Sequence, residues 1–255
     1  MASHRDPIQV LDEVAAPPTR TTDYGDDPAQ VYDVRLPQRA TRKLTVVVVH
    51  GGFWRPEYDR THASRQAQAF ADAGYPTASL EYRRAGMPGG GWPGTADDVA
   101  AAITAVRRDP DLGHPPVLVG HSAGGQLVAW AAAQPWAHGL RGIVTLAGVL
   151  DLGHGAQTGV GGSAISDFLG GGPTDAPTAY AAADPFRLAP GIPALVVHAH
   201  DDDVVPFDQS QRYAAAHHGP NVRLAPVGSG GHYGLIDPEN PAFAQVLAAV
   251  DLLAS

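Results

Sequence analysis

The chain has 255 residues, of which 44% are hydrophobic, so it is long and apolar enough to fold around a sizeable core. Its formal net charge of −9 argues against nucleic acid and against an anionic membrane surface as the main partner, because both favour basic proteins. The sequence contains no cysteine, which excludes disulfides, thiol catalysis and metal sites built on thiolates.

Residues 1–28 are polar and contain the turn-forming pairs Pro17-Pro18 and Asp27-Pro28, which predict a flexible N-terminal arm. The arm lacks the apolar segment of a signal peptide, and no window of the chain approaches the length of a membrane span. We therefore expect a cytoplasmic protein in which residues 29–255 form a single domain. The sequence does not predict an oligomeric state.

Short apolar runs follow the arm at intervals. Residues 31–36 alternate apolar and polar side chains and end at Pro37, which is typical of an outer strand. Residues 44–49 are nearly all β-branched, as in strands that are buried on both faces of a parallel sheet. Further strands are expected at residues 77–82, 117–119, 143–146, 195–197 and 222–227.

Helical patterns alternate with these strands. Thr95 and Asp98 have the spacing of a capping box at the start of a helix. An apolar stripe follows at Val99, Ile103 and Val106. A second stripe near the end of the chain consists of Phe243, Val246, Leu247, Val250 and Leu253. Such alternation of strands and helices predicts the α/β class, with a mostly parallel sheet and helices on both of its faces.

Residues 152–188 interrupt this alternation. They contain many glycines and no strand pattern, and short helices are expected at residues 167–169 and 180–183. A long insertion in a compact domain is usually a lid or a binding loop. The alternative is a flexible surface excursion without a role at the site.

A serine stands in a glycine-rich turn between two of the predicted elements. Gly120-His121-Ser122-Ala123-Gly124 matches G-x-S-x-G between a strand and a helix, the context that presents a nucleophile. The residues two positions before and after the serine come close together in such a turn, and glycine avoids the clash there. The N-terminus of the following helix favours negative charge beside the serine. The pattern predicts that Ser122 is a catalytic nucleophile.

A nucleophilic serine needs a base and a residue that orients the base. In the fold that uses this turn, an acidic residue and then a histidine follow the serine along the chain. His232 lies in a late glycine-rich loop and is the predicted base. Asp201, Asp202 and Asp203 follow a predicted strand, so each is a candidate for the orienting residue.

Acyl transfer also needs donors for the negative oxygen of the tetrahedral intermediate. The motif HGGFW at residues 50–54 follows a buried strand, and its glycines allow the backbone to approach the substrate closely. The predicted donors are the backbone N–H groups of Gly52, Phe53 and Ala123. His50 is expected to brace the loop, while the rings of Phe53 and Trp54 either line a pocket or pack in the core.

Four motifs, HGGFW, GHSAGGQL, DDDVVP and GGHYG, together resemble those of the α/β-hydrolase superfamily, and the resemblance extends from about Tyr24 to Leu253. The opening DYGDDPAQVYDVRLP, and HGG followed by an aromatic residue and Trp, are similar to the carboxylesterase and kynurenine formamidase (arylformamidase) branch. The resemblance implies an α/β-hydrolase fold with a mostly parallel central sheet, helices on both faces and a short glycine-rich lid at residues 152–188.

The resemblance also implies roles for particular residues. The loop DDDVVP is similar to the D-x-V-x-P ending of the acidic loop in this superfamily, with Asp202 as its aspartate, so Asp202 is the predicted orienting residue. The implied pocket residues are Trp54, Tyr82, Trp92 and Tyr233. The chain is therefore expected to be a serine hydrolase that cleaves a small-molecule ester or arylamide through an acyl-enzyme, without a cofactor.

Two alternative functions use the same residues. His198-x-His200-x-Asp202 resembles part of the H-x-H-x-D-H signature of binuclear metallohydrolases, but Asp203 stands where the last histidine is required. The fold could instead bind a small ligand without catalysis, as in proteins that have lost a triad member. Because candidates for all three members are present here, catalysis without a metal is the favoured interpretation.

Overall fold

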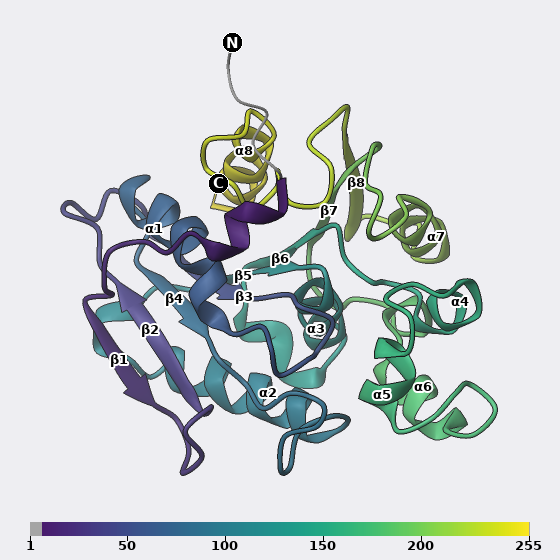
Figure 1. Ribbon diagram of the computed structural model, residues 1–255. Helices are drawn as coiled ribbons and strands as arrows, with labels where there is room; N and C mark the ends of the chain where they lie inside the picture. The colour runs from purple at the N-terminus through teal and green to yellow at the C-terminus, as the bar shows by residue number, and fades with distance from the viewer. Residues whose placement is uncertain (1–6, 255) are drawn as a thin grey trace.

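The computed structural model describes residues 7–254, within which eight strands form one sheet (Figure 1). The strands are ordered β1-β2-β4-β3-β5-β6-β7-β8 across the sheet. Their bounds are β1 (Arg20–Asp23), β2 (Val31–Arg35), β3 (Thr45–Val49), β4 (Thr77–Leu80), β5 (Pro116–His121), β6 (Gly142–Leu146), β7 (Ala194–Ala199) and β8 (Val222–Val227). Residues 1–6 of the predicted arm and Ser255 lie outside the described residues.

Most of the sheet is parallel. β3 pairs in parallel with β4 and β5, so that Val47 lies opposite both Ala78 and Leu118. The ladder continues in parallel from β5 through β6 and β7 to β8, whereas β2 is antiparallel to both β1 and β4. All seven strands expected from the sequence are present, and the predicted α/β class with a mostly parallel sheet is confirmed.

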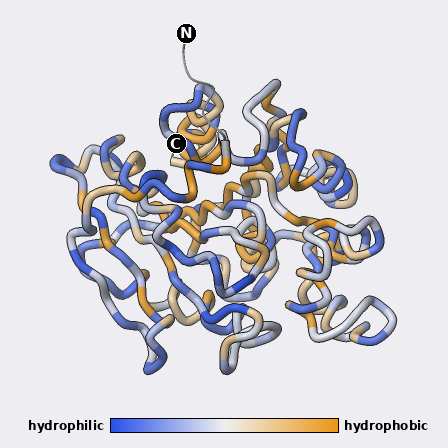
Figure 2. The backbone as a smooth tube through the Cα atoms, viewed as in Figure 1, coloured by the Kyte–Doolittle hydropathy of each residue, from blue (hydrophilic) through white to orange (hydrophobic). Residues whose placement is uncertain are grey.

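Helices cover both faces of the sheet (Figure 1). α1 (Ser64–Asp72) and α8 (Phe243–Ala254) pack on one face, and α2 (Gly94–Val106), α3 (Ala123–Ala132) and α7 (Asp208–Ala216) pack on the other. Figure 2 shows apolar segments gathered along the central strands. Alternate side chains of β3 serve the two cores, because successive residues of a strand face opposite sides. Within residues 7–254, no helix has the length and apolar character needed to cross a bilayer.

Part of the predicted N-terminal arm is an edge strand, so the expectation of a flexible arm is wrong for residues 20–23. β1 pairs with β2 and places Thr22 opposite Tyr32. Arg20 forms an ion pair with the buried Asp109, at 2.6 Å between Nη2 and Oδ1, and Tyr32 donates a hydrogen bond to the same carboxylate. Asp109 lies 89 residues from Arg20 along the chain, so the composition of residues 1–28 does not reveal this contact.

The predicted capping box at the start of α2 is also wrong. The helix begins at Gly94 with Pro93 at its N-cap position and no side-chain cap. Thr95 donates its hydroxyl to the Arg83 carbonyl instead, and the Arg83 guanidinium binds Asp98 at 2.7 and 2.8 Å. Thr95 and Asp98 are buried and bind Arg83 in the loop before the helix, so they do not cap its N-terminus. The predicted apolar stripe of this helix is buried as expected.

The insertion between β6 and β7 contains three short helices, α4 (Leu152–Thr158), α5 (Ala164–Leu169) and α6 (Pro177–Ala183). α5 and α6 include the two short helices expected there. Ile165, Phe168 and Tyr180 are buried in the same core as α2 and α3. The buried Asp184 accepts hydrogen bonds from the backbone of Leu152 and Gly153, which ties the end of the insertion to its beginning. The insertion therefore packs on the domain, and its role as a lid stays a prediction.

Replacing Asp109 with Ala is expected to lower the free energy of unfolding by about 3 kcal/mol, because the buried Tyr32 hydroxyl and the Arg20 guanidinium lose their shared acceptor. Asp111→Ala is the matched control, since Asp111 also contacts Arg20 at 3.1 Å but its side chain is 51% exposed. Exposed pairs contribute less than about 1 kcal/mol. Urea denaturation measures both values, and equal losses would contradict the role given to Asp109.

Candidate active site

Ser122 occupies a strained turn between β5 and α3. Its backbone angles are φ 55° and ψ −118°, a conformation that costs a residue with a side chain about 1–3 kcal/mol. The turn is compact, because a Cβ atom on Gly124 would lie 2.1 Å from the carbonyl oxygen of Val49, and one on Gly120 would lie 2.2 Å from that of Gly124. The backbone N–H of Ser122 donates to the Leu146 carbonyl at 2.9 Å, so β6 also holds the turn in place.

His232 is brought to this turn by the loop that follows β8. Asp201 shapes the loop by accepting hydrogen bonds from the backbone N–H groups of Gly230 and Gly231 at 3.2 and 2.8 Å. The imidazole of His232 is buried, and its Nδ1 lies 2.8 Å from Asp202 Oδ2. Since an ionised carboxylate can only accept, Nδ1 carries the proton of this hydrogen bond.

Of the three candidate aspartates, Asp202 is the one that contacts His232. Its side chain is fully buried, and its Oδ1 accepts hydrogen bonds from the backbone N–H groups of Val204 and Val205 at 2.9 and 2.8 Å. Burial alone would raise the pKa of Asp202, but hydrogen bonds from His198, His232 and the backbone outweigh it and hold this pKa well below its ordinary value. The carboxylate is therefore ionised beside His232.

In the fragment His198-x-His200-x-Asp202, which resembles a metal motif, His198 forms a hydrogen bond with the Asp202 carboxylate. His198 places Nε2 3.1 Å from Asp202 Oδ2 and 3.0 Å from the Val205 carbonyl, and its Nδ1 lies 2.7 Å from the Ser210 hydroxyl. The carbonyl fixes Nε2 as the protonated nitrogen, because a carbonyl oxygen cannot donate. The ring of His200 packs against Phe207, with ring centroids 4.2 Å apart. Both nitrogens of His198 thus have protein partners.

His121, the residue before the serine, contacts the loop of the predicted base. Its Nε2 donates to the His232 carbonyl at 3.0 Å, and the two rings lie 4.5 Å apart. Burial lowers the pKa of His121 well below its ordinary value, and the nearby His232 adds to this effect. A neutral imidazole therefore joins the turn to the His232 loop.

The loop after β3 lies directly against the serine turn. A Cβ atom on Gly51 would be 2.9 Å from the His121 carbonyl oxygen and 3.0 Å from the Ser122 Cβ. Gly52 and Phe53 both have positive φ, at 105° and 51°. The loop thus brings two of the predicted oxyanion donors to the serine, and the third, Ala123, is the first residue of α3.

Buried polar contacts brace this loop from behind. His50 lies with Nδ1 2.8 Å from the Gly51 carbonyl and Nε2 3.2 Å from Glu81 Oε1. The ring of Tyr82 stacks on His50 at 4.4 Å and its hydroxyl donates to the His50 carbonyl at 2.7 Å. His50 therefore occupies the bracing position expected for it.

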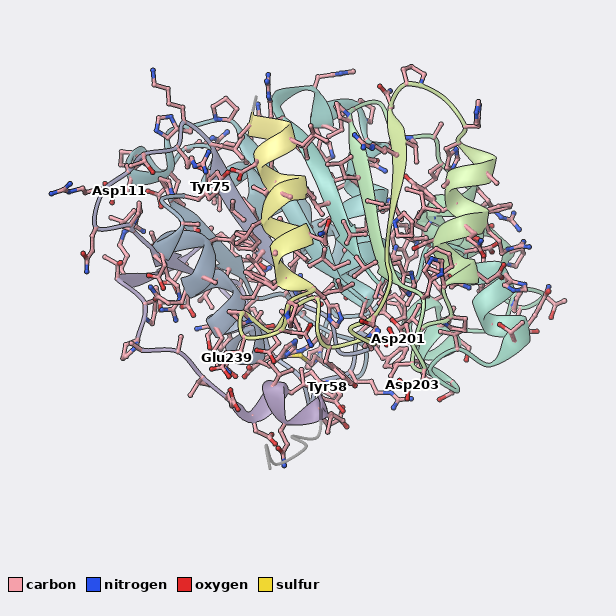
Figure 3. All side chains as sticks on the ribbon, turned by 90° about the horizontal axis from the view of Figure 1, so that it is seen from above. Tyr58, Tyr75, Asp111, Asp201, Asp203 and Glu239 are labelled. Atoms are coloured by element: carbon pink, nitrogen blue, oxygen red, sulfur yellow. The ribbon has the colours of Figure 1, made fainter. Side chains whose placement is uncertain are left out.

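A pocket of about 50 Å³ lies beside Ser122, and four separate parts of the chain line it. The lining residues are Leu11, Gly52, Phe53, Tyr58, His62, His121, Ser122, His232 and Tyr233. An open cleft of about 620 Å³ shares His232 and Tyr233 with this pocket and also includes Ile8, Asp201 and Asp203. Figure 3 shows Tyr58, Asp201 and Asp203 at one end of the molecule and Tyr75 and Asp111 at the other.

Of the four residues expected in a substrate pocket, Tyr233 lines the pocket beside Ser122 and the other three lie elsewhere. Trp54 is fully buried, donates to Gln126 at 3.1 Å and stacks on Phe168 of the insertion. Tyr82 is buried behind the loop against His50. Trp92 packs edge-on against Trp130 and Phe168. The rings of Trp54 and Trp92 fill the contact between the domain and the insertion, because burying their large apolar area there is more favourable than exposing it at the site.

Four lining residues were not expected. Tyr58 and His62 lie in the continuation of the HGGFW loop, so the residues that follow this motif were an available signal. His121 stands inside G-x-S-x-G itself. Nothing in the sequence links Leu11 to Ser122, because 110 residues lie between them and only folding brings them together.

Comparison with known families gives one assignment. The profile of the family described as BD-FAE matches residues 32–216, which is more than half of the chain. The match includes Ser122 and Asp202 and ends before His232. A search of functionally curated proteins found no match.

Solved structures share the fold at low identity. A truncated carbohydrate esterase from gut microbiota is 20% identical, with a TM-score of 0.78 over 95% of this chain and 99% of that one. The Est2 esterase of Thermogutta terrifontis with propionate bound is 22% identical, with a TM-score of 0.72 over 92% of this chain and 93% of that one. The chain spans only 37% of a bifunctional GH43-CE protein from Bacteroides eggerthii, at 21% identity and a TM-score of 0.75 over 91% of this chain.

The sheet, its helical layers and these likenesses define an esterase of the α/β-hydrolase superfamily. Within this superfamily, the chain belongs to the BD-FAE family.

Stability is expected to fall between pH 6.5 and pH 5 because His62 and His121 are buried as neutral rings. Burial lowers the pKa of His62 to about 3, and the neighbouring His50 adds to this effect. The unfolded chain binds more protons below its histidine pKa of about 6.5, so each ring removes about 1.4 kcal/mol of unfolding free energy per pH unit.

Urea denaturation across this pH range tests the expectation. His62→Gln should reduce the slope of unfolding free energy against pH by the contribution of one buried imidazole. His218→Gln, at an exposed position, should leave this slope unchanged. The same slope in His62→Gln and in the unsubstituted protein would show that His62 is not buried as a neutral group.

Proposed function

We propose that the protein is a serine hydrolase of small carboxylic esters or arylamides that acts through Ser122, His232 and Asp202 and an acyl-enzyme. One observation carries the proposal: Asp202 Oδ2 and His232 Nδ1 are 2.8 Å apart inside the protein, next to a pocket that Ser122 and His232 both line. Membership of the BD-FAE family supports ester chemistry. The partner is a small-molecule substrate.

The reaction begins at the serine hydroxyl. His232 donates Nδ1–H to Asp202, so its Nε2 is the nitrogen that takes the proton as Ser122 Oγ attacks the substrate carbonyl carbon. The tetrahedral intermediate collapses, the bond to the leaving group breaks, and the alkoxide or amine leaves with the proton from Nε2. Water then attacks the acyl group on Ser122 with His232 again as the base. The carboxylic acid is released and Ser122 regains its proton.

The surrounding groups lower the barrier by electrostatics. The depressed pKa of Asp202 keeps a negative charge beside His232, which stabilises the imidazolium that forms during attack. The backbone N–H groups of Gly52, Phe53 and Ala123 are the proposed donors to the oxyanion, and each is expected to contribute about 3 kcal/mol. Ala123 also stands at the positive end of the α3 dipole.

Ser122→Ala is expected to lower kcat by about 10⁶-fold, as with other triad serines. It should also abolish covalent labelling by a fluorophosphonate probe, because the attacking oxygen is absent. Circular dichroism should be unchanged, since Ala removes one oxygen atom from the turn. Ser229→Ala, an exposed serine on the His232 loop, is the control and should retain labelling and activity.

The assay uses p-nitrophenyl acetate and N-formylkynurenine in parallel. A kcat/KM for the formamide well above that for the ester would assign the arylformamidase branch. Residual activity of Ser122→Ala within tenfold of the unsubstituted protein would show that another group is the nucleophile.

Asp202→Asn is expected to lower kcat by about 10⁴-fold at neutral pH, because the amide neither holds the His232 tautomer nor stabilises its cation. Asp203→Asn is the matched control on the same loop, where the side chain lines the open cleft. It should change kcat less than about threefold, because Asp202 and not Asp203 holds the tautomer of His232. A larger loss in Asp203→Asn than in Asp202→Asn would reverse the assignment.

A further inference from the structure

A short 3-10 helix near the start of the chain lies at the active-site end of the sheet. This helix, η1 (Pro7–Asp12), precedes β1 and lies outside residues 32–216, which the family profile matches. Figure 3 shows it beside Tyr58, at the end of the molecule where Asp201 and Asp203 also lie. The helix is therefore placed to contact whatever enters the site.

Leu11 of this helix forms part of the pocket wall. It lines the same pocket of about 50 Å³ as Ser122 and His232, and it is the aliphatic side chain among the residues of that lining. The side chain is half-buried and also packs against the core beneath α1 and α8. Leu11 thus presents an apolar surface directly to the space beside the nucleophile.

Several contacts hold the helix in this position. Val10 is buried in the core with Phe70 of α1 and Phe243 of α8. A few residues further along, the backbone N–H of Ala15 donates to the Ser64 hydroxyl at 3.0 Å.

Arg65 connects the segment after the helix to the loop of the base. Its guanidinium forms ion pairs with Glu13 on one side and with Glu239, on the loop that carries His232, on the other. The wall formed by Leu11 is therefore a packed part of the fold.

The two cavities differ in their contact with the nucleophile. Ser122 lines the smaller pocket of about 50 Å³ and does not line the open cleft of about 620 Å³, so the smaller pocket is the one assigned to the acyl group. His232, which gives its proton to the leaving group, lines both cavities, and the open cleft is the one with room for a larger leaving group. One water molecule takes up about 30 Å³ in the liquid, so the smaller pocket holds only a small acyl group of about two or three carbons.

We propose that the protein is selective for short acyl groups and that Leu11 is the residue that sets the length limit. The inference rests on the proposed function of Ser122, because an acyl pocket has meaning only where an acyl-enzyme forms. Replacing Leu11 with a smaller side chain extends the pocket toward η1, and replacing it with a larger one shortens the pocket.

The test is a series of p-nitrophenyl esters from acetate to octanoate, which share one leaving group. In the unsubstituted protein, kcat/KM should decrease beyond propionate. Leu11→Ala should raise the ratio of kcat/KM for hexanoate to that for acetate by about tenfold or more, since one methylene in a hydrophobic pocket changes discrimination by about 10-fold to 200-fold. Leu11→Phe should move the same ratio in the opposite direction.

Val14→Ala is the matched control, because Val14 belongs to the same segment but is 64% exposed. It should leave the ratio unchanged. An unchanged ratio in Leu11→Ala, or an equal change in Val14→Ala, would overturn the proposal. The ratio also separates pocket size from general damage, because partial unfolding lowers the rates for all esters together.

Fluorophosphonate labelling of each variant distinguishes failure of the acyl-length proposal from failure of the proposed function. If the unsubstituted protein is labelled at Ser122 and hydrolyses the esters while the ratio does not respond to Leu11, the length limit alone is wrong. If the unsubstituted protein is neither labelled nor active on any ester, the serine hydrolase proposal fails, and the acyl-length proposal fails with it.

Discussion

The arrangement of the site depends on the close approach of the chain after β3 to the turn between β5 and α3. A side chain on Gly124 would overlap the carbonyl oxygens of Val49 and His50, at 2.1 and 2.4 Å from its Cβ. Because glycine stands there, α3 begins against the end of β3. Ser122, Gly52 and Phe53 consequently line one pocket. The strain of the serine turn is maintained by this packing, since β3 and β6 on either side leave the turn no room to relax.

A buried carboxylate organises the second half of the site. Burying a charge is costly unless hydrogen bonds replace water, and Asp202 receives them from two imidazoles and two backbone N–H groups. His198, inside β7, therefore has a structural reason to be a histidine. The neighbouring Asp201 holds the His232 loop through its backbone. Adjacent aspartates thus perform different tasks: Asp202 binds the His232 imidazole, and Asp201 binds the backbone of the loop that carries it.

The aromatic residues near the motifs illustrate a different constraint. Trp54 and Phe168 stack with centroids 4.6 Å apart, and the Arg55 guanidinium donates to the Gly161 carbonyl at 3.0 Å. These contacts join the HGGFW loop to the insertion. The large rings stabilise the region behind the site, while the smaller space beside Ser122 is lined by Phe53, Tyr58 and three imidazoles. Pocket size is therefore set by side chains from distant parts of the chain.

Local patterns in the sequence determined the parts of this protein that depend on neighbouring residues. Continuous apolar runs predicted the parallel strands, because a strand buried on both faces has apolar side chains on both. The G-x-S-x-G spacing predicted the turn at Ser122, because its glycines are required within five residues. What the tertiary structure alone decided involves partners far apart in the chain. Asp109 converts part of the expected arm into β1, Arg83 takes Asp98 from the expected cap, Phe168 removes Trp54 from the pocket, and Leu11 enters it. Such contacts form because burial and hydrogen bonding stabilise residues that are close in space. A pattern of neighbouring residues in the sequence does not show which distant residues will be close.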